Sequence, residues 1–67
     1  MNATINGEQK QFEADRLPLK ELLNELGLAK HPVVVEHNGE ALLPAEHADA
    51  VVADGDRLEI VKVVAGG

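Results

Sequence analysis

The sequence predicts a small α+β fold in which a mixed sheet of four to five strands wraps around one helix. Apolar and polar residues alternate at the start and near the end of the chain, which is the pattern of half-buried strands. Between them lies one amphipathic helical stripe, and Asn-Gly and Asp-Gly pairs mark tight turns. One helix cannot bury two sheet faces, so the compact arrangement is a sheet curved around it. We expect residues 1–67 to form a single domain.

The N-terminal residues predict a hairpin. Residues 1–5 alternate in polarity with the odd positions apolar, and Asn6-Gly7 supplies the two positive φ angles that a type I′ turn requires. We expect a return strand over about residues 9–13, which carries Phe12, the only aromatic residue, toward the core.

One helix follows, because leucines recur at the spacing i, i+3, i+4 and i+7. These leucines are Leu19, Leu22, Leu23 and Leu26. Pro18 suits the first helical turn, and Gly27 suits the left-handed position that closes a helix. Neither Leu17 nor Pro18 offers a side-chain oxygen as a cap, so packing must stabilise this short helix.

The middle of the chain predicts short strands separated by turns. Val33–His37 is rich in β-branched residues and is closed by Asn38-Gly39, a second turn pair. Residues 41–43 predict a short strand that ends before a proline, and residues 44–49 predict a single helical turn.

The C-terminal part predicts the central strand of the sheet. Val51 and Val52 are expected to fill the core beneath the preceding loop. Asp54-Gly55-Asp56 predicts a tight turn before a last strand over residues 57–64. We expect this strand to lie beside the first one, because these two segments are the most regularly apolar.

Composition and charge argue against several classes of function. Twelve acidic and six basic residues give a net charge of −6, which disfavours nucleic-acid binding and favours basic protein surfaces. Cysteine is absent, so disulfides and thiolate metal sites are excluded. The sequence shows neither a leader pattern nor an apolar run of about 18 residues, so we expect a cytoplasmic protein without a membrane contact.

Catalytic and metal sites are not expected either. The three histidines, His31, His37 and His47, follow no compact ligand spacing, and Thr4 is the only hydroxyl side chain. A chain of 67 residues also has little room for a deep active site beside its core. We therefore expect a protein on which other proteins act, without catalytic side chains, a metal or a bound cofactor.

The end of the chain carries the features that indicate a function. Alternation along residues 57–64 turns Val61 and Val63 outward, and Val64 continues the apolar run, which predicts an exposed patch for partner docking. Ala65-Gly66-Gly67 then predicts a flexible tail over about residues 65–67. A terminal glycine carboxylate has no side chain beside it, so such a tail can enter a narrow active site.

These residues carry a resemblance to a known family. The pattern Asp54-Gly55-Asp56-x-Leu58-Glu59-Ile60-Val61-x-x-Val64-x-Gly66-Gly67 resembles the ThiS-type sulfur carrier of thiazole synthesis in thiamine biosynthesis. The similarity covers nearly the whole chain, through Asn6-Gly7, Glu21-Leu22-Leu23 and Val35 to Asn38-Gly39. The family implies a β-grasp (ubiquitin-like) fold, in agreement with the predicted order of elements.

The resemblance also implies a function. An adenylating enzyme (ThiF-like) would activate the terminal carboxylate with ATP, and a sulfur donor system would convert it to a thiocarboxylate. Thiazole synthase (ThiG-like) would then take the sulfur. Gly67 would bear the adenylate and the thiocarboxylate, and Gly66 would keep the approach narrow.

Two residues depart from the family pattern, and alternatives stay open. His47 stands where an aromatic residue, often Trp, tends to occur, and Pro18 stands in the place of a capping Thr. The small subunit of molybdopterin synthase uses the same tail chemistry, but it is usually longer and tends to have prolines where this chain has Lys62-Val63. A carrier for another sulfur pathway, such as cysteine synthesis or tRNA thiolation, is a further alternative. A noncovalent β-grasp interaction module, in which Gly-Gly is incidental, is an alternative of another class.

Overall fold

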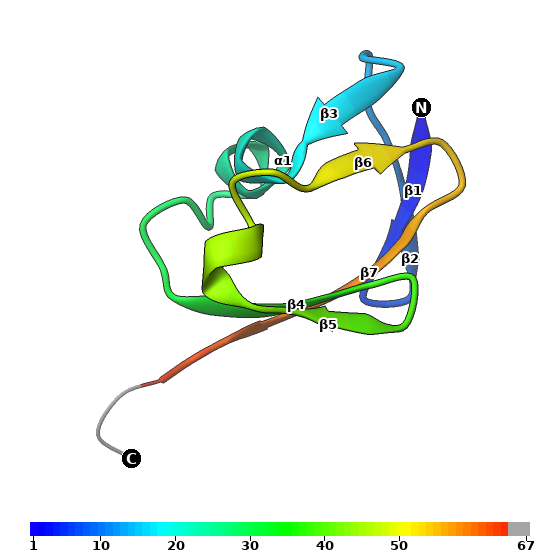
Figure 1. The fold of residues 1–67 in the computed structure, drawn as a ribbon. Coiled ribbons are helices and arrows are strands. Elements are labelled where there is room, and N and C mark those ends of the chain that lie inside the picture. Colours follow the sequence, from blue (N-terminus) through cyan, green and yellow to red (C-terminus); the bar gives the residue numbers. More distant parts are fainter. Residues whose placement is uncertain (65–67) are drawn as a thin grey trace.

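A computed structural model describes residues 1–64 of the chain (Figure 1). Its strands are β1 (Asn2–Ile5), β2 (Glu8–Gln11), β3 (Arg16–Pro18), β4 (Val33–His37), β5 (Glu40–Leu42), β6 (Val51–Ala53) and β7 (Arg57–Lys62); the helix α1 spans Leu19–Glu25 and a 3₁₀ turn η1 spans Pro44–Glu46. Five strands form a mixed sheet in the order β2-β1-β7-β4-β5, and β3 and β6 form a separate two-stranded ribbon. The sheet curves around α1, which confirms the predicted β-grasp fold.

The central position predicted for the last strand is confirmed. β7 runs parallel to β1 on one side, where Ile5 pairs with Leu58, and antiparallel to β4 on the other, where Val35 pairs with Ile60. These four side chains are buried. They belong to a core that also includes Ala3, Leu17, Leu19, Leu22, Leu23 and Val52.

The helix ends as the sequence predicts. Gly27 has φ +77° and follows the C-cap residue, Leu26. The Gly27 N–H donates to Asn24 O at 3.0 Å, and the Leu28 N–H donates to Leu23 O at 2.8 Å, which is the bonding of a Schellman motif. The start of the helix has no side-chain cap, and the Leu19 N–H instead donates to Ala50 O at 2.9 Å, just before β6.

The ribbon β3–β6 was not predicted, and it corrects one expectation about the core. Leu17 pairs with Val52, and both are buried. Val51 pairs with Pro18 and is 41% exposed, so the expectation that both valines fill the core is wrong for Val51. Successive side chains of a strand point to opposite faces, which allows only one of two neighbours to face inward.

Strand boundaries also differ from the predicted ones by one or two residues. β2 ends at Gln11, and Phe12 follows it, half-buried against the core. β7 ends at Lys62 rather than Val64. The helical turn expected over residues 44–49 is the shorter η1.

Candidate functional site at the end of the central strand

The candidate site begins where β7 leaves the sheet. After its last residue, Lys62, the Val63 N–H donates to Pro32 O at 2.9 Å. Val64, the last described residue, is 82% exposed, and Figure 1 shows the chain leading away from the body of the molecule at this point. The predicted tail residues Ala65, Gly66 and Gly67 lie outside the described residues.

Two asparagine side chains hold β7 in place from either side. Asn6 acts as a bridge, because its Nδ2 donates to Ile60 O at 3.0 Å and its Oδ1 accepts the Ile60 N–H at 2.7 Å. On the β4 side, Asn38 Oδ1 accepts the Arg57 N–H at 2.8 Å. Both asparagines have φ +51° and open the predicted Asn-Gly turns. Sequence reasoning found the turns but missed this second role of their side chains.

Four exposed valines surround the exit of the chain. Val61 lies directly opposite Val34 of β4, and these side chains are 61% and 51% exposed. Val63 and Val64, the next members, are also exposed. We call Val34, Val61, Val63 and Val64 the valine patch. Sequence reasoning found three of them but missed Val34, whose place depends on the register between β4 and β7.

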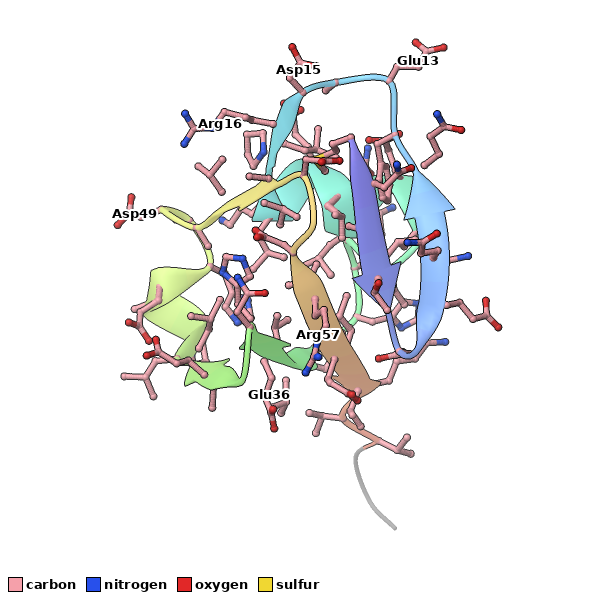
Figure 2. The ribbon with its side chains drawn as sticks, turned by 90° about the vertical axis from the view of Figure 1, so that its right-hand side faces the viewer. Glu13, Asp15, Arg16, Glu36, Asp49 and Arg57 are labelled. Atoms are coloured by element: carbon pink, nitrogen blue, oxygen red, sulfur yellow. The ribbon has the colours of Figure 1, made fainter. Side chains whose placement is uncertain are left out.

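Charged residues continue this outer face of the sheet beyond the valine patch. Glu36 of β4 lies opposite Glu59 of β7. Arg57 lies two residues before Glu59 in the same strand. Among residues 1–64 none of these three charges forms an ion pair. Figure 2 shows Glu36 and Arg57 in the lower half of the molecule, with Glu13 and Asp15 at the opposite, upper end. Two carboxylates facing each other repel, so this surface favours a partner that supplies a basic group.

The turn before β7 is organised by Asp56. Its Oδ2 lies 2.7 Å from His37 Nε2 and accepts the Ala53 N–H at 2.9 Å, and its Oδ1 accepts a hydrogen bond from Asn38. Partial burial acts to raise the pKa of Asp56, but these hydrogen bonds outweigh it and hold the pKa below 3.8. The ionised carboxylate therefore joins the β4–β5 turn to the start of β7.

The three histidines do not gather at one site. His37 is occupied by Asp56, whereas His31 and His47 both line one hollow beside α1. Within residues 1–64, no group of three or more potential ligands lies close enough to hold a metal ion. In the same part of the chain, no helix has the length and apolar character needed to cross a membrane.

Comparisons with known proteins place this geometry in a family. The chain is 40% identical to the sulfur carrier protein ThiS of Thermus thermophilus over 63 residues, which cover 94% of this chain and 95% of that protein. It is 42% identical over its full length to a thiazole synthase of Paramagnetospirillum magneticum, of which it spans only 20%. The crystal structure of the thiamine biosynthesis protein ThiS from Geobacter metallireducens matches with a TM-score of 0.86 and 38% identity over 100% of both chains. The model of the ThiS family matches residues 2–67, and the chain belongs to this family.

Proposed function

We propose that this chain carries sulfur on its terminal residue, Gly67, as a thiocarboxylate. Its family gives it the role of a sulfur carrier in thiamine biosynthesis, as the sequence predicted. The observation that carries the proposal is the path of β7, which passes through the middle of the sheet and leads the chain away from the body. The root of the tail is therefore an ordered strand that a partner protein can bind while it acts on the terminal residue.

The proposed chemistry takes place in partner enzymes. A carboxylate is a poor electrophile, so an adenylating enzyme first joins it to AMP from ATP and releases pyrophosphate. Hydrosulfide supplied by a donor system then attacks the acyl carbon, AMP leaves as the C–S bond forms, and a thiocarboxylate remains on Gly67. In this scheme the carrier supplies no catalytic side chain and binds no cofactor. The adenylation step needs ATP, which agrees with a cytoplasmic location of the carrier.

The position of Val63 sets the reach of the tail. The hydrogen bond between Val63 and Pro32 is the last described tie to the body, and four residues follow it. An extended chain spans at most 3.3–3.6 Å per residue, so these residues reach about 13–14 Å. That length can thread a buried nucleotide site while the folded body stays outside.

The valine patch is the proposed docking surface for these enzymes. It surrounds the root of the tail, so a protein that binds the patch also holds the tail near its own active site. Entry of the tail then becomes an intramolecular step with a high effective concentration. Glu36 and Glu59 beside the patch favour a basic group on the partner.

Thiazole synthase is the proposed acceptor of the sulfur. A relative with this name contains a region that matches all 67 residues of this chain. The carrier domain and the thiazole synthase are thus parts of one polypeptide in that organism. Joining two proteins in this way raises the local concentration of each for the other, which agrees with successive steps of one pathway.

Intact-mass spectrometry tests the proposal. The chain is incubated with a ThiF-like adenylating enzyme, ATP and a sulfur donor, with the Thermus thermophilus ThiS in parallel as a positive control. The expected product is heavier by the exchange of one oxygen for one sulfur, and fragmentation places the change on Gly67. A variant without Gly67 should fold normally and remain unmodified. An unmodified full chain, under conditions in which the control reacts, would contradict the proposal and favour a noncovalent interaction module.

A further inference from the structure

A hollow of about 350 Å³ lies on the flank of the molecule between α1, the loop that follows it and η1. Its volume falls within the range of about 300–1,000 Å³ that is usual for small-molecule sites. The lining residues that matter here are Lys20, Leu23, Leu28, His31, Pro32 and His47.

The apolar wall of the hollow is built by the end of the helix. The two hydrogen bonds of the Schellman motif fix the backbone from Leu23 to Leu28. This motif commonly brings the side chains at these two positions together, and both residues line the hollow. The wall therefore exists before any ligand arrives.

The charges of the hollow have one sign. The titratable residues among its lining are Lys20, His31 and His47, and none of the lining residues between 1 and 64 carries a carboxylate. Basic groups above an apolar wall complement a ligand that has an anionic head and a hydrocarbon body.

His47 is the lining residue of the hollow that has an unpartnered polar atom. The residue is only 9% exposed, and its Nε2 is buried without a hydrogen-bond partner among the described residues. Burial of a polar atom without a partner is unfavourable, and in the described position Nε2 is closed off from the hollow as well as from solvent. A ligand atom can therefore pair with it only after the ring has turned. A half-turn of the ring about the Cβ–Cγ bond exchanges Nε2 with Cε1, which allows the imidazole to offer a nitrogen without a change in the backbone.

We propose that this hollow binds a small organic carboxylate with an aromatic or aliphatic body. The body packs against Leu23 and Leu28, and the carboxylate faces Lys20 and the imidazole of His47. The proposal does not depend on the chemistry of Gly67. Pro32, another lining residue, accepts the Val63 N–H, so the amide of Val63 is a natural reporter of binding at the root of the tail.

An NMR titration of the ¹⁵N-labelled full chain tests the site with benzoate and 3-phenylpropanoate, at constant pH and ionic strength. We expect saturable shifts that centre on the amides of Leu28, Ala29 and Val33 and extend to Val63. Benzamide has the same ring without the charge and should bind about fivefold more weakly or less. Equal binding of benzoate and benzamide would overturn the assignment of an anion site, and so would shifts that do not saturate. Shifts caused only by a purified thiazole synthase would place a protein in the hollow instead.

Two variants locate the binding. Lys20→Gln, at an exposed position of α1, should weaken benzoate binding about two- to fivefold. Lys10→Gln on β2 removes the same charge elsewhere and should leave binding unchanged. His47→Phe keeps an aromatic ring but removes both nitrogens, and it should reduce the preference for benzoate over benzamide. If His47→Phe does not fold, the two lysine variants decide, and equal effects of both would overturn the proposal.

Discussion

Asn6 and Asn38 each combine two tasks that other residues do not combine as well. Each adopts φ +51°, which asparagine tolerates better than most residues with a Cβ atom. Each also uses its side-chain amide to bind the backbone of β7. Asn6 does so at Ile60, two residues after the last pair between β1 and β7. The asparagine of each Asn-Gly pair therefore both forms the turn and holds β7 by side-chain hydrogen bonds.

Substitution of Asn6 separates these two tasks. Asn6→Gly keeps the positive φ accessible but loses both hydrogen bonds to Ile60, and should lower the free energy of unfolding by about 1–3 kcal/mol. Asn6→Ala adds the strain of a left-handed backbone and should cost about 1–2 kcal/mol more. Urea unfolding of the three proteins measures both differences. Equal stability of the native chain and Asn6→Gly would show that these side-chain hydrogen bonds contribute nothing.

Asp56 makes the free energy of unfolding depend on pH in the acidic range. Its pKa in the folded state lies below its ordinary value of 3.8, so its ionised form stabilises the fold at any pH above that value. The contribution is lost as the pH falls below about 3.8 and passes through the folded-state pKa. We expect the advantage of the native chain over Asp56→Asn, measured by urea unfolding, to shrink as the pH falls below about 3.8.

Asp49→Asn is the control for this effect. Within the described chain the Asp49 carboxylate makes no hydrogen bond or ion pair, so this variant should differ little from the native chain throughout the titration. A ¹³C titration of the Asp56 carboxyl group checks the cause directly. A midpoint at or above 3.8 would contradict the role given to the bonds from His37, Asn38 and Ala53.

At the scale of elements, the sequence predicts α1, β4 and β7 because each carries a pattern over several residues. The leucine stripe of α1 and the β-branched run of β4 are local signals. β3 and β6 have only three residues each, and β3 ends in a proline. They exist because Leu17 and Val52 pair across more than 30 residues of sequence and share the core. A pairing of this kind leaves no periodicity in either segment.

The two valines of β6 test this account of the ribbon. Val52 is fully buried, so Val52→Ala removes buried methyl groups and leaves a cavity, with an expected loss of about 2–3 kcal/mol. Val51 is 41% exposed, and Val51→Ala should change stability by no more than about 0.5 kcal/mol. Chemical denaturation distinguishes the two. Similar losses for both variants would mean that β6 does not turn one face to solvent.

At the scale of the whole molecule, the sequence predicts where the valine patch lies along the chain but not all the residues that belong to it. Val61 and Val63 follow from alternation along the last predicted strand, and Val64 follows from the apolar run that continues it. Val34 joins them through pairing with Val61, and the opposition of Glu36 and Glu59 follows from the same register. The pairing brings together residues that are 23 to 27 positions apart in the sequence. Strands this short do not determine their register alone, because it depends on the packing of the complete fold. The tail chemistry stays a prediction, and a sequence pattern is enough to propose it because it needs a terminal glycine rather than a three-dimensional arrangement of side chains.

Docking through the valine patch can be tested apart from folding. Val61→Glu and Val63→Glu place a charge in the apolar centre of the proposed interface and should weaken binding to the adenylating enzyme by about tenfold or more. Both side chains are exposed in the free carrier, so stability should fall by less than about 1 kcal/mol. Val51→Glu is the matched control, because it adds the same charge at an exposed valine outside the patch. Isothermal titration calorimetry measures affinity, and urea unfolding measures stability. If all three variants bind equally well, the enzyme recognises another surface of the carrier, and the tail must find its active site without help from the valine patch.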